Sequence, residues 1–186
     1  MASDFGKTLE AVLEYDREQQ ERLAALQDYD AYLERLSRAI GEKEQELEKL
    51  CEEASAIRRR YATTLCGKIR EHLVDLNFLN VEFELDFTRL SGYTANGFDD
   101  AEFVISTNPG ELLRPLAKIA SGGELSRVML AIKTVLADKD QIETVIFDEI
   151  DVGISGRTAQ KVSEKMMLIG RTRQVICITH LAQIAA

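Results

Sequence analysis

The chain has 186 residues, 45% hydrophobic and 30% charged, which fits a soluble protein with one domain of ordinary size and room for an appendage. Its formal net charge of −9 argues against a generic nucleic-acid-binding surface, because such surfaces are usually basic. No apolar run is long enough to cross a membrane, and no signal-peptide pattern opens the chain. Cys51, Cys66 and Cys177 fit neither a metal site nor a disulfide framework, which favours a reducing cytoplasm.

The first part of the chain is predicted to be one long helix, because residues from about Thr8 to Leu76 contain no proline and show a heptad repeat. The repeat consists of Leu26, Leu33, Ile40, Leu47, Ala54 and Tyr61. A second row, made of Leu36, Leu50 and Ile57, lies three residues after members of the first. Lys43 and Thr64 interrupt the second row, and Asp28-Tyr29-Asp30 is a candidate position for a phase change or a break.

An apolar seam this narrow needs a partner helix, so the repeat predicts a coiled coil. A helix packed along its own globular domain is the alternative. It is less favoured, because roughly seventy helical residues span about 100 Å, far more than the diameter of a domain built from the remaining residues.

After Leu76 the hydrophobic period changes. Alternation from Val81 to Phe87 predicts a half-buried strand, residues 91–100 read as a hairpin loop, and residues 102–106 as a second strand. A turn is expected at residues 108–110 and a helix that begins with Ser121 as its cap. A buried strand over 144–147, a helix over 158–169 and a buried strand over 174–179 then form a βαβ unit.

Two carboxylates follow the first strand of that unit. Asp148 and Glu149 would lie at the carboxyl edge of a parallel sheet, where ligands bind in open α/β folds. There Asp148 is suited to hold Mg²⁺, usually through a water, and Glu149 to orient an attacking water. Taken alone the pattern is weak, since many strands end in acids simply because acids favour solvent.

A helix start and a histidine complete the set of candidate residues. Ser121-Gly122-Gly123-Glu124 could bring backbone amides close to a phosphate at a helix N-terminus, although for this tetrapeptide alone a capped helix after a flexible loop is the favoured interpretation. His180 directly follows the last strand and could contact a γ-phosphate and the catalytic water. His72 is assigned no role. No phosphate-binding loop of the form Gly-x-x-x-x-Gly-Lys-Ser/Thr occurs in the sequence.

The order and spacing of these segments resemble the C-terminal half of an ABC-type ATPase head, with a signature motif, a Walker B strand, a D-loop and a switch histidine. The preceding coiled coil narrows the resemblance to the SMC-like branch, and the chain is most similar there to the RecN family of bacterial double-strand-break repair proteins. The similarity runs from roughly Phe5 to the end of the chain. Its most specific parts are residues 105–111, 116–127, 147–160 and 178–181.

The resemblance implies an α/β fold: the C-terminal lobe of an ABC/SMC-type P-loop NTPase head, with a mainly parallel sheet and flanking helices, after a coiled-coil arm. The arm would occupy residues 1–76 and the half-head residues 77–186. Asp148 would be the magnesium residue, with Glu149 and His180 catalytic. Residues from Ser121 to Glu124 would serve the ATP of an opposing head. Ser155 stands where the D-loop of other ABC proteins has Asp, which leaves the cross-dimer role of that position open.

The resemblance further implies ATP and Mg²⁺ as cofactors, and a cytoplasmic, nucleoid-associated ATPase in DNA repair. Its partners would be a P-loop half of the same protein, a second copy through the heads, and DNA. Without the P-loop, this chain alone is expected to be inactive. The alternative is a coiled-coil tethering protein with a half-head that does not hydrolyse ATP. Candidate DNA contacts, weighed against an ordinary solvated helix face, are Arg58, Arg59, Arg60, Lys68 and Arg70.

Overall fold

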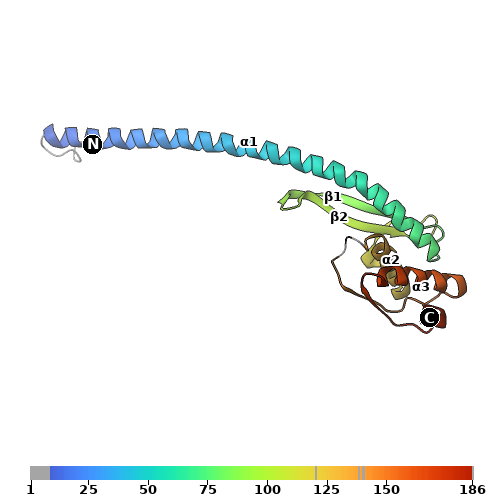
Figure 1. Cartoon of the computed structure of the whole chain (residues 1–186). Coiled ribbons are helices and arrows are strands. Elements are labelled where there is room, and N and C mark those ends of the chain that lie inside the picture. The colour runs from blue at the N-terminus through green and yellow to red at the C-terminus, as the bar shows by residue number, and fades with distance from the viewer. Residues whose placement is uncertain (1–8, 120, 138, 140, 186) are drawn as a thin grey trace. The chain divides into compact units, whose positions relative to one another are not determined.

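The structure is a computed structural model that describes residues 9–119, 121–137, 139 and 141–185 (Figure 1). Phe5, Thr8 and Ala120, which belong to segments used above, lie outside these residues. The chain divides into two compact units, Met1–Glu53 and Ala54–Ala186, which are described separately. The domain boundary expected after residue 76 stays a prediction. None of the described helices is both long enough and apolar enough to cross a membrane.

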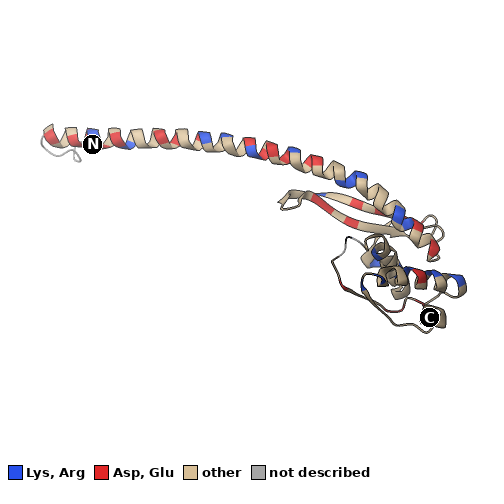
Figure 2. Ribbon diagram, in the orientation of Figure 1, with Lys and Arg blue, Asp and Glu red and all other residues tan. Residues whose placement is uncertain are grey.

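One helix, α1, spans Leu9–Asp75 and supplies everything that is described of the first unit. It passes through Asp28-Tyr29-Asp30 without interruption, so the break considered there does not occur. Charged residues of both signs are distributed along it (Figure 2). The heptad row is exposed in this unit, with Leu26, Leu33, Ile40 and Leu47 between 39% and 55% accessible. Among the described residues, therefore, the seam has no partner.

The second unit contains an antiparallel sheet in the order β1-β2-β3, built from β1 (Glu82–Thr94), β2 (Gly97–Ser106) and β3 (Arg114–Pro115). The expected loop over residues 91–100 is wrong, because both strands continue through most of it. Only Ala95 and Asn96 turn, and Gly97 has a φ of 93°. The hairpin is longer than predicted because Phe98 and the Asp99 side chain are buried, and these tertiary contacts are not encoded in the Gly/Asn/Asp-rich composition of the segment.

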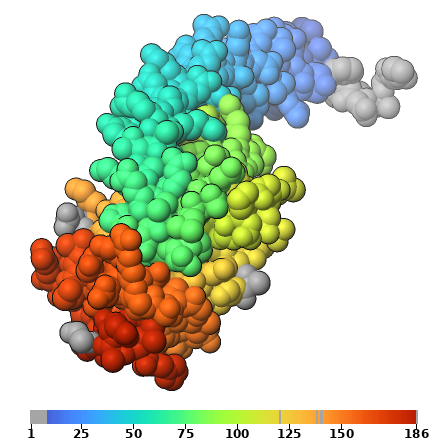
Figure 3. Space-filling view, turned by 90° about the vertical axis from the view of Figure 1, so that its right-hand side faces the viewer, coloured from blue at the N-terminus to red at the C-terminus, as the bar shows by residue number. Residues whose placement is uncertain are grey.

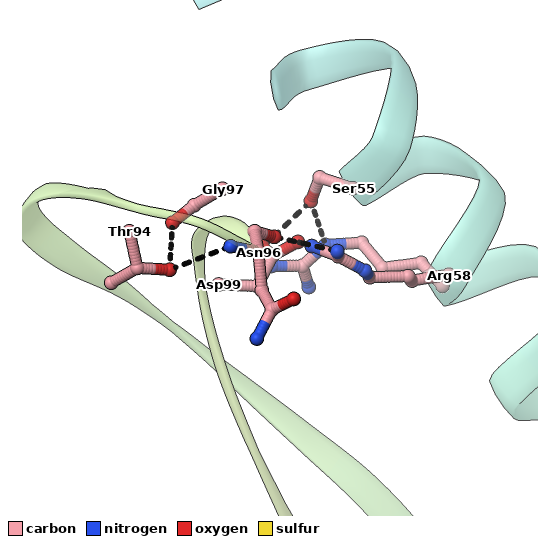
Figure 4. A network of polar contacts seen from close by, with 7 residues as sticks. Ser55, Arg58, Thr94, Asn96, Gly97 and Asp99 are labelled. Carbon is pink, nitrogen blue, oxygen red and sulfur yellow. Dashed lines mark hydrogen bonds and ion pairs between the residues drawn. The ribbon is translucent and has the colours of Figure 1, made fainter. Parts of the chain in front are cut away.

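Contacts to the side of α1 fix the tip of this hairpin. Arg58 donates to Asp99 Oδ2 at 3.0 Å and to the carbonyl of Asn96 at 2.6 Å (Figure 4). Ser55 donates to the other carboxylate oxygen of Asp99 at 2.9 Å. The Asp99 side chain is only 2% exposed, so the Arg58 guanidinium compensates a carboxylate that would otherwise be buried without a counter-charge. Thr94 closes the turn by donating to the carbonyl of Gly97.

The remaining elements form the predicted βαβ unit and its neighbours. Strand β4 (Thr144–Phe147) pairs in parallel with β5 (Gln174–Cys177), and α3 (Gly156–Gly170) connects them. A short 3-10 helix, η1 (Leu116–Lys118), precedes α2 (Gly122–Val135), and α4 (Ala182–Ala185) follows β5. The expectation of a mainly parallel sheet therefore applies to the β4–β5 pair, while the larger described sheet is antiparallel.

A single hydrophobic core joins these elements. The end of α1 contributes Ile69 and Leu73, and Leu76 follows the helix directly; all three are fully buried and belong to the same core cluster as Val128 of α2 and Val162 of α3. The green end of α1 and the orange surface of α3 are neighbours in Figure 3. The last third of α1 is thus part of the globular unit as well as the continuation of the long helix.

One face of the β4–β5 sheet is uncovered. Val145 and Phe147 are buried, but Ile146, Ile176 and Ile178 are 64%, 43% and 54% exposed. The expectation that both strands are fully buried is wrong for this face. Their continuous apolar pattern is typical of strands covered on both sides, and no described element covers the second side.

Candidate functional site

The carboxyl ends of β4 and β5 bring two of the predicted segments together. Phe147 is paired with Cys177, and the amide of Ile178 continues the ladder by donating to the carbonyl of Phe147 at 3.0 Å. Asp148 and Glu149 follow β4 directly, and His180 lies three residues beyond β5. All three side chains are exposed. The parallel register therefore places the two acids and the histidine on adjacent loops at one sheet edge.

The backbone at the two acids is unusual. Glu149 has a φ of 56°, in the left-handed region that few non-glycine residues adopt. Its amide donates to Oδ1 of Asp148 at 2.8 Å, so one oxygen of Asp148 stabilises the turn and the other is unengaged in the described contacts. The carbonyl of Glu149 accepts from the amide of Val152 at 3.1 Å, which closes the turn after β4. Left-handed backbone at a cluster of acids is a recurrent property of functional sites.

Asp151 links the two loops, and the sequence analysis did not single it out. Its Oδ2 accepts a hydrogen bond from the hydroxyl of Thr179 at 2.6 Å and one from the amide of His180 at 2.5 Å. The Thr179 hydroxyl oxygen in turn accepts from the amide of Leu181 at 3.1 Å. These bonds lower the pKa of the Asp151 carboxyl, with the Thr179 hydroxyl as the largest cause. Asp151 is therefore a charged link between the loop after β4 and the loop after β5.

The N-terminus of α2 packs against this turn. Ser121 caps the helix as predicted, since its hydroxyl accepts from the amide of Glu124 at 3.4 Å. A Cβ on Gly122 would lie 2.1 Å from Oε2 of Glu149, so the Glu149 carboxylate rests on the first turn of α2. A Cβ on Gly123 would lie 2.8 Å from the carbonyl oxygen of Glu149. Both glycines are thus in close contact with the residue proposed above as the base.

A buried arginine of α2 fixes the same turn. Arg127 is 7% exposed and donates through Nη1 to the carbonyl of Val152 at 2.8 Å and, more weakly, to that of Ile150 at 3.4 Å. Its guanidinium lies over the ring of Phe78, and burial lowers its pKa. The sequence analysis quoted Arg127 within the motif but gave it no function, because its carbonyl partners lie far along the chain.

Ser155, at the D-loop position, precedes α3. It is the N-cap residue by position, yet its side chain makes no capping hydrogen bond, and it is exposed. Its hydroxyl is therefore not used to cap the helix. The structure brings Ser155 onto the chain segment that follows the turn of Asp148 and Glu149.

The five basic residues suggested for DNA lie on the part of α1 that belongs to the second unit, in differing environments. Arg58 is committed to Asp99 and Asn96, and Arg59 stacks on the ring of Phe87 at 4.7 Å while donating to Ser55. Arg60, Lys68 and Arg70 are exposed. Arg60 lies over the ring of Tyr61. The structure thus leaves three of these five cations available to a ligand.

The residues present suit a nucleotide and Mg²⁺ only in part. Within the described ranges no group of three or more His, Cys, Asp or Glu side chains could hold a metal. Mg²⁺ commonly takes one or two carboxylates and completes its shell with water and phosphate oxygens, so a single ligand from Asp148 is compatible with it. The close approach allowed at Gly122 and Gly123 suits an anion at the α2 N-terminus, since a carboxylate already lies there.

The chain is similar in sequence to bacterial DNA repair proteins over almost its whole length. The DNA repair protein RecN of Treponema pallidum is 44% identical over 199 residues, covering 98% of this chain and 33% of that protein. RecN of Halalkalibacterium halodurans is 39% identical over 186 residues, covering 98% and 33%. RecN of Bacillus subtilis is 36% identical over 197 residues, covering 98% and 34%. The chain belongs to the RecN family. It spans about a third of the length of these RecN relatives. No family model matches it.

Solved structures support the fold. The Smc head domain with a coiled coil and joint from Pyrococcus yayanosii has a TM-score of 0.60 at 20% identity, covering 96% of this RecN-family chain and 32% of that one. The Smc head with an extended coiled coil from Pyrococcus furiosus, bound to the C-terminal domain of ScpA, has a TM-score of 0.56 at 20% identity, covering 89% and 39%. The fold is therefore that of part of an SMC-type head domain together with its helical arm, as predicted.

Proposed function

We propose that the intact protein is an SMC-like ATPase of DNA double-strand-break repair, in which head engagement and ATP hydrolysis are linked to DNA binding. One observation carries this proposal: a single sheet edge presents Asp148, Glu149 and His180 on two loops that Asp151 joins. Membership of the RecN family supports the repair context. Localisation in the bacterial cytoplasm, at the nucleoid, follows as part of the same proposal.

In this proposal the residues at the sheet edge divide the chemistry. Asp148 would hold Mg²⁺ through a water, and Glu149 would accept a proton from the attacking water. His180 contacts the transferred phosphoryl group from the other loop. When bound, the nucleotide would supply the phosphates on which these residues act, and Mg²⁺ would neutralise the negative charge that develops on them. The exposure of all three side chains supports the assignment, because a site completed by another surface must be open in its absence.

The start of α2 is assigned to an opposing head. Residues from Ser121 to Glu124 would present amides and a hydroxyl to the phosphates held by a second copy, and Ser155 would face the same interface. Support comes from the exposure of Gly122 at this helix N-terminus, where the nearby Glu149 carboxylate shows that an anionic group fits. Ser155 is exposed and makes no capping bond, so its hydroxyl is free for a contact across the interface.

A P-loop half of the same protein is the proposed partner for the uncovered sheet face. Ile146 and Ile176 are exposed there, and a groove of about 300 Å³ runs between α2 and β4, lined by Leu125, Met129 and Val145 among others. Exposed apolar side chains on parallel strands are expected to be covered in a stable head. The arm, through residue 76, would pair its seam with a second helix of the same protein.

The decisive experiment joins this chain to the polypeptide that carries the P-loop half and measures steady-state ATP hydrolysis. Glu149→Gln should still bind ATP but lower kcat by about a hundredfold or more, because the general base is lost. Glu143→Gln, an exposed residue just before β4, is the matched control and should retain full activity. Unchanged turnover in Glu149→Gln would remove Glu149 as the base. Absence of hydrolysis in the joined wild-type protein would instead favour the alternative of a tethering protein without hydrolysis, which the RecN relatives do not favour.

The proposed DNA contacts reduce to Arg60, Lys68 and Arg70, because Arg58 and Arg59 have partners within the chain. Replacing these three with Glu in the intact protein should weaken DNA binding and lower its salt dependence by about one unit of slope for each phosphate contact removed. Arg38→Glu, exposed on the first unit, is the control. Equal affinity and equal salt slope for the triple variant and the wild type would exclude this surface.

A further inference from the structure

We propose that Asp151 is a positioning residue that sets the placement of His180 relative to Glu149. The inference rests on the function proposed above and adds a residue to it. Asp151 contacts the switch-histidine loop through two hydrogen bonds to one oxygen, at 2.6 Å from Thr179 and 2.5 Å from His180. Its own place in the chain is two residues after Glu149. A change at Asp151 therefore alters the relation between the two loops without touching the reacting groups.

The receiving end of this link is rigid. The Thr179 hydroxyl donates to Asp151, and its oxygen then accepts from the amide of Leu181 at 3.1 Å. The amide of His180, between these two residues, is held by the same carboxylate. Three consecutive residues are thereby fixed, and the direction in which the His180 side chain leaves the backbone is fixed with them. Hydrogen bonds of this length to a charged acceptor are among the stronger ones in proteins.

The other end of the link is equally well held. The turn that contains Asp151 is closed by the amide of Val152 donating to Glu149 and by Arg127 donating to the carbonyl of Val152 at 2.8 Å. The amide of Ile154 also donates to the carbonyl of Asp151 at 3.3 Å. The carboxylate therefore connects two loops that are each held by hydrogen bonds, one carrying the proposed base and one carrying the histidine. Small misplacements at such sites are costly in rate.

The test uses the intact protein with its P-loop half. Asp151→Ala should lower kcat by about ten- to a hundredfold while the KM for ATP and ATP-induced head pairing stay within about twofold. In a His180→Ala background the same substitution should change kcat by less than about twofold, because its effect passes through the histidine. Equal losses in both backgrounds, or no loss in either, would overturn the proposal.

Two further pairs keep the test valid if Asp151→Ala fails to fold. Asp151→Asn retains an acceptor oxygen without the charge and should lose less activity than Ala. Thr179→Ser keeps the hydroxyl and should be close to wild type, whereas Thr179→Val removes it and should lower kcat. Equal activity of Thr179→Ser and Thr179→Val would contradict the link.

Should Glu149→Gln or His180→Ala retain full turnover, the proposed function itself fails. Should those two lose activity while every Asp151 and Thr179 variant keeps it, only the present inference fails.

Discussion

At the scale of single residues, the two glycines that begin α2 are under different constraints. The neighbour of Gly122 is the terminal carboxylate of Glu149, which is flexible and could move away from an added methyl group. The neighbours of Gly123 are the carbonyl oxygen of Glu149 at 2.8 Å and Cβ of Val152 at 3.0 Å from a Cβ placed there. Neither can move without shifting the turn. Gly123 is therefore required by packing inside this chain, in addition to any contact with a phosphate.

Gly123→Ala should consequently lower the free energy of unfolding by about 1–3 kcal/mol, the usual cost of overpacking a buried site. Gly67→Ala is the control: it lies in α1 with nothing within 4 Å of the added methyl group, and should raise the free energy of unfolding by up to about 1 kcal/mol. Urea unfolding of both variants, followed by circular dichroism, makes the comparison. A neutral Gly123→Ala would show that the turn after β4 yields readily.

The site was predictable in part at this scale, and the reason is topological. Asp148, Glu149 and His180 follow two strands that a right-handed βαβ connection makes parallel neighbours, so their shared edge follows from the pattern. Asp151 and Arg127 carry no such signal. Their partners are Thr179, His180 and the carbonyl of Val152, all 25 or more residues away, and only the folded backbone brings them within reach.

At the scale of elements, a polar cluster joins the end of α1 to α3. Lys165 of α3 is nearly buried, and its ammonium group lies 2.7 Å from Nδ1 of His72 and 2.9 Å from Oδ2 of Asp75. Both partners come from the last turns of α1. Sequence reasoning assigned His72 no role, yet its ring is one of two acceptors for a nearly buried cation. Burial first, and then the nearby Lys165, lower the pKa of His72.

This cluster predicts a stability that depends on pH near neutrality. Because the pKa of His72 is lower in the folded chain than its ordinary value of 6.5, the unfolded chain binds more protons just below that pH. The contribution of neutral His72 to the free energy of unfolding should therefore be complete above about pH 6.5. It should decrease as the pH drops toward the folded-state pKa of His72. The carboxyls of Asp75 and Asp151, whose pKa values are also lowered, extend the loss to more acidic pH.

The free energy of unfolding, measured across pH 5 to 8 in wild type and His72→Gln, isolates the contribution of the histidine, since few other groups ionise near pH 6.5. The variant should lose most of the dependence of this free energy on pH in that interval. A matched control is Lys161→Met, which removes an exposed ion pair with Glu164 on the same helix and should leave the slope unchanged. A wild-type curve that is flat over this interval would contradict the assignment of His72.

Elements with a clear period were predictable, and elements defined by pairing were not. The long helix and the strand-helix-strand unit follow from heptad and alternating patterns. The extension of the hairpin through Thr94 depends on Arg58 and Ser55 holding Asp99, which no local pattern encodes. Strand β3 consists of Arg114 and Pro115 alone, and a two-residue strand ending in proline has no sequence signature.

At the scale of the whole molecule, both units expose apolar surface that nothing described in the chain covers. In the first unit it is the heptad row of α1, and in the second it is the face of Ile146, Ile176 and Ile178. Each is a pattern that sequence reasoning reads as buried, because the pattern specifies burial without specifying which chain provides the partner. A seam without a partner and a half-covered sheet are the expected properties of a polypeptide that functions together with another segment.

The same reasoning predicts how the chain behaves toward ATP. In the proposed function Asp148, Glu149 and His180 would act on phosphates without binding them tightly, since the Gly-x-x-x-x-Gly-Lys-Ser/Thr loop that binds phosphates does not occur in the sequence. Calorimetric titration of the chain alone should show no saturation up to about 1 mM ATP, the upper end of ordinary KM values.

Co-folding with the P-loop half should produce saturable binding and should cover Ile146 and Ile176, so that hydrogen exchange of β4 and β5 slows. Saturable micromolar binding by the chain alone would show that the edge of β4 and β5 is a complete nucleotide site. Exchange that stays unchanged in the joined protein would place the P-loop half elsewhere on the head.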